Sequence, residues 1–214
     1  YANALGGLAG YYNSLGDYNK AVELGTMAMN ILKEALGENH PEYASSLAGL
    51  ASYYADLGNY NKAIEFGTMA MNIRKEALGE NHPVYATSLN NLAGYYNSLG
   101  DYNKAVELET MATNINKEAL GENHPNYATS LDNLAVYYSR LGDYNKAVEL
   151  GTMAMNIRKQ TLGENHLSYA TSLSNLANYY HYLGNYNKAI EFGTMAMNIR
   201  KQTLGENHPD YALS

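Results

Sequence analysis

Residues 85–126 read YATSLNNLAGYYNSLGDYNKAVELETMATNINKEALGENHPN. Apolar side chains recur three or four residues apart through both halves of this stretch, and that spacing gives a helix one apolar stripe. Gly100 and Gly121 follow the two stripes, and a glycine that adopts positive φ commonly ends a helix. The stretch therefore predicts a helix A over about 85–99 and a helix B over about 102–120.

The same pattern recurs along the chain with a period of 42 residues, from Tyr1 to Tyr211, and the phrase LGENH lies near the end of every repeat. Two helices with one apolar stripe each cannot bury those stripes alone, so successive helix pairs must stack on one another. We therefore expect a single domain, 1–214, of five stacked repeats. Their bounds are 1–42, 43–84, 85–126, 127–168 and 169–210, with 211–214 as the start of a further repeat.

Composition excludes several classes of function. The chain carries 14 basic and 21 acidic residues, a formal net charge of −7, which argues against nucleic acid and anionic membranes as partners. The absence of cysteine excludes disulfides, thiolate metal sites and cysteine nucleophiles. The sequence has neither a run of about 18 apolar residues nor a charged and then apolar leader. We expect a cytoplasmic location without membrane contact.

Each repeat also carries a family signature. The residues that form it in the third repeat are Leu89, Leu92, Ala93, Tyr96, Gly100, Tyr102, Ala105 and Ala112. Their order and spacing resemble the tetratricopeptide repeat (TPR), and the 42-residue length is similar to the repeats of kinesin light chains. The resemblance implies an all-α, right-handed α-solenoid of ten helices plus the start of an eleventh, with protein ligands held in a concave groove lined by helices A.

One column of the repeats departs from that family. TPRs usually place a large aromatic residue four positions after the first alanine of helix B, whereas this chain has Gly25, Gly67, Glu109, Gly151 and Gly193 there. A glycine inside a helix costs about 0.5–1 kcal/mol relative to alanine. We therefore expect the packing at this column to differ from the family pattern.

No pattern of catalytic residues is present, and we expect no enzyme activity, no metal and no cofactor. Glycine-rich phosphate loops, H-E-x-x-H pairs and recurring Ser, His and Asp sets are absent. Successive copies of the recurring histidine lie a helix pair apart, about 10 Å or more, whereas the ligands of one zinc ion lie about 2 Å from it. These histidines, which we expect to cap or fill the link between repeats, are His40, His82, His124, His166 and His208.

The repeats differ from one another mainly on one face of helix A, opposite the apolar stripe. This face is rich in asparagine, whose amide both donates and accepts hydrogen bonds, as pairing with a peptide backbone requires. We expect it to bind an extended peptide or a helical segment, although drift of an exposed surface would give the same pattern. The candidate residues are Thr87, Asn90, Asn91, Asn97, Thr129, Asp132, Asn133, Arg140, Thr171, Ser174, Asn175, Asn178 and His181.

The charge of this face limits the ligand. Arg140 is its only cation and stands against Asp56 and Asp132, so the several Lys and Arg residues of a carboxylate clamp are missing. We therefore expect a ligand other than a peptide with a strong requirement for negative charge.

Three features of the chain support weaker expectations. Glu109, Thr113 and Asn116 form a polar stripe on one helix B, which we interpret as drift on the convex surface. Methionines such as Met27 and Met29 recur at fixed positions and are expected in or beside the core. Gly6, Gly7 and Gly10 fall within one helix, so we expect the first repeat to fray.

Two other functions fit the same repeats. Near-identical repeats with uncapped ends would suit a structural element that self-associates end to end. The array would also suit a regulatory or sensor arm of a larger signalling protein, as an analogy from the fold alone.

Overall fold

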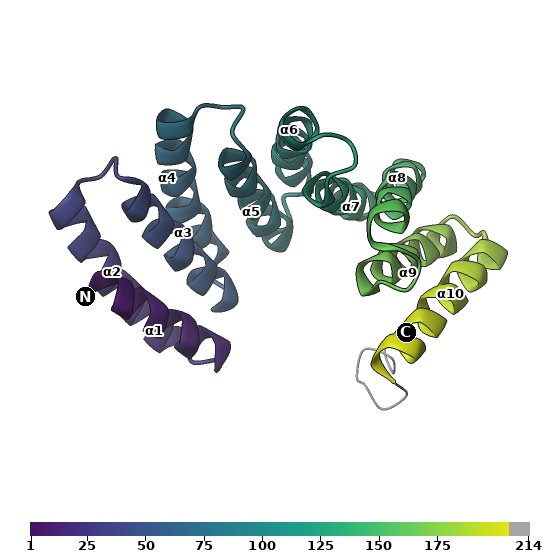
Figure 1. Ribbon diagram of the computed structural model, residues 1–214, viewed down its shortest axis with the longest axis horizontal. Helices are drawn as coiled ribbons and strands as arrows, with labels where there is room; N and C mark the ends of the chain where they lie inside the picture. Colours follow the sequence, from purple (N-terminus) through teal and green to yellow (C-terminus); the bar gives the residue numbers. More distant parts are fainter. Residues whose placement is uncertain (206–214) are drawn as a thin grey trace. The chain divides into compact units, whose positions relative to one another are not determined.

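The computed structural model describes residues 1–205, and this part of the chain consists of ten α-helices joined by short links, with no strand (Figure 1). The predicted all-α solenoid of helical hairpins is confirmed. The predicted start of an eleventh helix and the cap at His208 lie outside the described residues. The helices are α1 (Ala2–Ser14), α2 (Tyr18–Leu36), α3 (Pro41–Asp56), α4 (Tyr60–Leu78), α5 (Pro83–Leu99), α6 (Tyr102–Leu120), α7 (Pro125–Arg140), α8 (Tyr144–Leu162), α9 (Leu167–Tyr182) and α10 (Tyr186–Leu204).

The chain divides into two compact units, which we call the N-terminal unit (Tyr1–Ile115) and the C-terminal unit (Asn116–Ser214). In the N-terminal unit each helix from α1 to α5 packs against the next, and in the C-terminal unit the same holds from α7 to α10. Odd-numbered helices are helices A and even-numbered ones are helices B. The single-domain organisation and the five repeat bounds remain predictions.

The ends of the helices follow the capping residues of the sequence. Before each helix B an Asp or Asn oxygen accepts a hydrogen bond from the backbone N–H three residues later, as Asp143 does from Lys146 at 3.0 Å. Before α3, α5, α7 and α9 a histidine Nδ1 accepts from the N–H two residues later, as His124 does from Asn126 at 3.1 Å. The structural role expected for these four histidines is confirmed.

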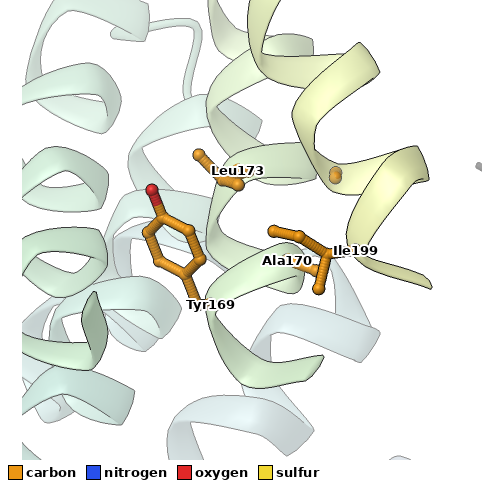
Figure 2. Close-up of a cluster of buried hydrophobic side chains, with 5 residues drawn as sticks. Tyr169, Ala170, Leu173 and Ile199 are labelled. Atoms are coloured by element: carbon orange, nitrogen blue, oxygen red, sulfur yellow. The ribbon is translucent and has the colours of Figure 1, made fainter. Parts of the chain in front are cut away.

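The core lies where the apolar stripes of neighbouring helices meet. Figure 2 shows one such contact, in which Tyr169, Ala170 and Leu173 of α9 pack with Ala196 and Ile199 of α10. Small residues recur in this core: Ala63, Ala105 and Ala147 of helices B are fully buried, and such small side chains allow helices to pack at short range.

The methionines divide into two classes. Met29 packs beside the buried cluster of Tyr43, Leu47 and Ala70, as expected. The expectation was wrong for Met27, which is 42% exposed, as are its repeat equivalents to a similar extent. Met27 and Met29 are two residues apart and therefore point about 200° apart around the helix, so only one of them can face the core.

At Gly25, Gly67 and Gly151 of helix B the missing side chain leaves a socket, a small space that Leu and Tyr side chains of the following helix A fill. A β-carbon at Gly67 would lie 3.1 Å from the Cδ2 atom of Leu92 and 3.3 Å from Tyr95. Gly151 stands in the same relation to Leu176 and Tyr179, at 3.2 and 3.3 Å. At these sockets the aromatic side chain thus comes from the next helix A.

The polar stripe on α6 is not surface drift, and that interpretation was wrong. Glu109 is 0% exposed, and Thr113 and Asn116 are also buried. Glu109 accepts two hydrogen bonds from Asn90 Nδ2, at 3.0 and 3.1 Å, and Asn116 Nδ2 donates to Ser130 Oγ at 3.1 Å. Glu109 stands at the position that glycine occupies in the other repeats, where helix B packs closely against its neighbours. A polar side chain at this position therefore lies inside the protein.

Candidate functional site

All the predicted binding residues lie on helices A, on α5 of the N-terminal unit and on α7 and α9 of the C-terminal unit. They differ in exposure. The exposed ones are Thr87, Asn91, Thr129, Arg140, Thr171, Asn178 and His181. The partly buried ones are Asn90, Asn97, Asn133, Ser174 and Asn175, and Asp132 is buried.

One asparagine at an equivalent position of α5, α7 and α9 has a free amide. Asn91, Asn133 and Asn175 stand at equivalent positions 42 residues apart, exposed or partly exposed. None of the three forms a hydrogen bond or ion pair with another described residue. Each amide therefore keeps its two donors and its acceptor for a ligand.

The threonines of the predicted set are already engaged. The hydroxyls of Thr87, Thr129 and Thr171 each donate to the carbonyl four residues earlier, at 3.0–3.1 Å. A hydroxyl bonded in this way keeps only acceptor capacity. Asn90 is likewise committed to Glu109. The free amides are therefore the better candidates for contacts with a ligand.

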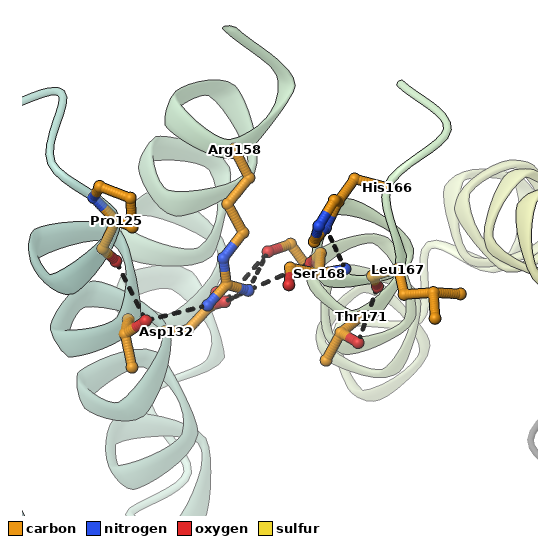
Figure 3. Close-up of polar contacts among 9 residues, drawn as sticks. Pro125, Asp132, Arg158, His166, Leu167, Ser168 and Thr171 are labelled. Carbon is orange, nitrogen blue, oxygen red and sulfur yellow. Dashed lines mark hydrogen bonds and ion pairs between the residues drawn. The ribbon is translucent and has the colours of Figure 1, made fainter. Parts of the chain in front are cut away.

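Asp132 does not belong to the exposed face, and its predicted place there was wrong. It is 5% exposed and forms an ion pair with Arg158 of α8 (Figure 3). Arg158 Nη1 also donates to Ser172 Oγ of α9 at 2.8 Å, and Ser172 Oγ donates to Asp132 Oδ2 at 3.0 Å. A carboxylate, a guanidinium and a hydroxyl from three helices thus meet at one point.

Sequence reasoning missed Arg158 because binding residues were sought on helices A alone. The signal is present in the helix B column that holds Leu32, Arg74, Asn116, Arg158 and Arg200. Long cationic side chains in such a column can reach helix A from the side. Arg140 is therefore not the only cation near these residues.

Burial governs the electrostatics of this cluster. It raises the pKa of Asp132 to about 6, although the Arg158 charge and the Ser172 hydrogen bond lower that pKa. Burial also raises the pKa of Tyr179, and the Asp132 charge adds to the rise. Asp132 Oδ1 and the Tyr179 hydroxyl are both buried without a hydrogen-bond partner.

The N-terminal unit has a small, partly open pocket at the equivalent place. Its lining includes Ala48, Arg74, Ser88, Asn91 and Tyr95. Arg74 Nη1 donates to Ser88 Oγ at 2.9 Å. Burial lowers the pKa of Arg74, and it raises the pKa of Tyr95 to about 12, with a further contribution from Asp56.

Among residues 1–205 no group of three or more His, Asp or Glu side chains is placed to hold a metal ion. None of the ten helices in that range combines the length and the apolar character that crossing a membrane requires.

Comparison with known proteins identifies the family. The tetratricopeptide repeat model matches residues 1–76, 50–118, 111–160, 153–202 and 170–214. The chain belongs to the tetratricopeptide repeat family. The TPR fold is generally a scaffold for protein–protein interaction and is typically non-catalytic, so it implies protein partners.

Solved structures agree with this family. A kinesin light chain candidate of Podosopora anserina, with nearly identical TPR-like repeats, is 29% identical over 94% of this chain and 95% of that chain, with a TM-score of 0.84. BtubC (BKLC) from P. vanneervenii is 26% identical over 94% and 80%, with a TM-score of 0.81. Apo RapI, 20% identical over 94% and 71%, shares the fold with a TM-score of 0.82. No curated protein sequence matches the chain.

Proposed function

We propose that this TPR chain is a non-catalytic scaffold that binds an extended peptide or a helical segment in a groove lined by its helices A. The observation that carries the proposal is the column of free amides at Asn91, Asn133 and Asn175. An extended peptide offers alternating N–H and C=O groups, and a primary amide can pair with both.

The neighbouring residues suit a polar ligand of low net charge. Asn178 and His181 lie exposed on α9, the helix that carries Asn175. Thr129 and Thr171 supply acceptors beside Asn133 and Asn175. Such a surface binds through hydrogen bonds, each of which contributes about 0.5–1.5 kcal/mol.

A peptide-selection experiment tests the proposal. Peptides would be selected from a random library on the wild-type chain, and their Kd measured for a variant with Asn91→Ala, Asn133→Ala and Asn175→Ala. Loss of three amides is expected to weaken binding by at least about tenfold. The matched control replaces three exposed asparagines of helices B, Asn72, Asn114 and Asn156, by alanine and should retain the wild-type Kd.

The mass of the chain in solution completes the test. It should stay constant over a concentration series for the wild type and both variants. If the selected peptides bind the amide variant as tightly as the wild type while the mass rises with concentration, the chain is a self-assembling element and the groove proposal is wrong.

A further inference from the structure

Three equivalent positions carry different groups in the two units. In the C-terminal unit they hold Asp132, Arg158 and Ser172, on α7, α8 and α9. Two repeat periods earlier, in the N-terminal unit, they hold Ala48, Arg74 and Ser88, on α3, α4 and α5. The arginine and the serine are kept, and only the carboxylate is missing.

In the C-terminal unit the carboxylate saturates this site. Asp132 Oδ2 accepts from Arg158 Nη1 and from Ser172 Oγ, and Arg158 Nη1 donates further to the Ser168 carbonyl at 3.2 Å (Figure 3). Asp132 and Ser172 are both at least nine-tenths buried. A carboxylate oxygen held by a guanidinium and a hydroxyl has the geometry of a bound anion, with the ligand tethered to α7.

In the N-terminal unit the arginine and the serine are present, but Ala48 replaces the carboxylate. Arg74 Nη1 donates to Ser88 Oγ at 2.9 Å, and Arg74 forms no ion pair with any described residue. The methyl group of Ala48 leaves a pocket beside them, lined also by Asn91 and Tyr95. A partly buried guanidinium without a counter-charge has lost hydration that an anion can replace.

The size of the pocket limits the ligand. Its volume is about 10 Å³, close to what one water molecule needs. One oxygen of an incoming group can sit inside, and the remainder must stay in the open mouth. A carboxylate meets this limit more easily than a phosphate, which carries three further oxygens, or an aromatic ring.

We propose that Asp132 is a tethered ligand that closes the Arg158 site, and that the equivalent pocket at Arg74, Ser88 and Asn91 receives the carboxylate of an acidic side chain from the bound partner. The inference rests on the proposed function, because the pocket and the amide column share Asn91. The N-terminal unit thus binds one acidic residue of the partner, whereas Asp132 already fills the equivalent position of the C-terminal unit.

The side-chain Nε–H signals of Arg74 and Arg158 in an NMR spectrum test the pocket directly. Sodium acetate is titrated into the wild-type chain, with sodium chloride at equal ionic strength as the control. The Arg74 signal should shift saturably with acetate and the Arg158 signal should not. Sodium phosphate serves as the competing anion, and a stronger response of Arg74 to phosphate than to acetate would overturn the carboxylate assignment.

Two substitutions exchange the sites. Ala48→Asp supplies the tethered carboxylate. The Arg74 signal should therefore shift in the absence of acetate and should not shift further when acetate is added. Asp132→Ala copies the alanine of the N-terminal unit, so Arg158 should become responsive to acetate. Ala48→Ser, the residue that the chain carries at Ser174, is the control for a small polar change and should leave Arg74 responsive.

The outcomes separate this inference from the proposed function. An Arg74 signal that treats acetate and chloride alike, or a folded Asp132→Ala chain whose Arg158 ignores acetate, overturns the inference. If Asp132→Ala does not fold, the Ala48→Asp and Ala48→Ser pair decides it. Acetate binding does not depend on the amide column. If the selected peptides bind the amide variant as tightly as the wild type while acetate still shifts the Arg74 signal, the groove proposal is wrong and the carboxylate pocket stands. The affinity of selected peptides that contain Asp or Glu should be at least about tenfold lower for the Ala48→Asp chain than for the wild type, and the affinity of neutral peptides should not change.

Discussion

At the scale of single residues, the chain shows how burial and pairing compete at one carboxylate. Asp132 has a cation and a hydroxyl within hydrogen-bond distance, both of which favour its charged form. Its burial between three helices favours the neutral form more strongly, so the pKa rises to about 6. An ion pair formed where water is excluded is thus no assurance of a stable charge.

This balance predicts an unusual dependence of stability on pH. The pKa of Asp132 in the folded chain lies above the value of about 3.9 in an unfolded chain. The folded state therefore binds the proton more tightly, and the stabilisation from this group is complete below about pH 4 and lost as the pH rises through about 6. The free energy of unfolding of the C-terminal unit should fall by an amount on the order of 2–3 kcal/mol across that window.

Urea unfolding at a series of pH values measures the effect. The Asp132→Asn variant cannot titrate at this position, so the difference between wild type and variant isolates the carboxyl. A parallel 13C titration of the Asp132 carboxyl should show its midpoint near 6. A midpoint near 4, or equal pH dependence in the two chains, would mean that Arg158 outweighs burial.

At the scale of helices, local chemistry was predictable and contacts between helices were not. Gly100, Asp101 and the histidine of each link fix helix ends through groups a few residues away, so the sequence predicted them correctly. Glu109 and Asp132 differ because their surroundings come from other helices. A comparison of the repeats shows that a residue has changed to a charged type, but it does not show in which direction the side chain points.

The first helix provides an element-scale prediction. α1 extends from Ala2 to Ser14 although it contains Gly6 and Gly7. That it frays stays a prediction, because fraying depends on the free energy of unfolding of this helix. A β-carbon at either glycine meets nothing within 4 Å. Gly6→Ala and Gly7→Ala should each stabilise α1 by about 0.5–1 kcal/mol, and slower amide hydrogen exchange across α1 would measure it.

Gly67→Ala is the matched control for these changes. The substitution offers the same gain in helix propensity, but its β-carbon would lie 3.1 Å from Leu92. The neighbours must shift, so Gly67→Ala should give less stabilisation than Gly6→Ala or a net loss. Equal gains at the three positions would show that the socket contacts are loose and that only propensity matters.

At the scale of the whole molecule, the helices from α1 to α5 and from α7 to α10 pack mainly against their neighbours in the chain, and the chain forms two compact units. Stability in such an array is approximately a sum of repeat and nearest-neighbour contributions. A cavity in one unit should therefore weaken the helices beside it and leave distant helices nearly unchanged.

Leu47 and Leu173 allow this locality to be measured in both directions. Both side chains are fully buried, Leu47 in α3 and Leu173 in α9, and each Leu→Ala change should cost about 2–5 kcal/mol locally. Leu47→Ala should accelerate amide exchange in α3 and α4 while α9 and α10 keep their rates, and Leu173→Ala should give the reverse. If either variant accelerates exchange evenly along the chain, the repeats unfold as one cooperative body, and a ligand bound at α5 would then stabilise α9 and α10 as well.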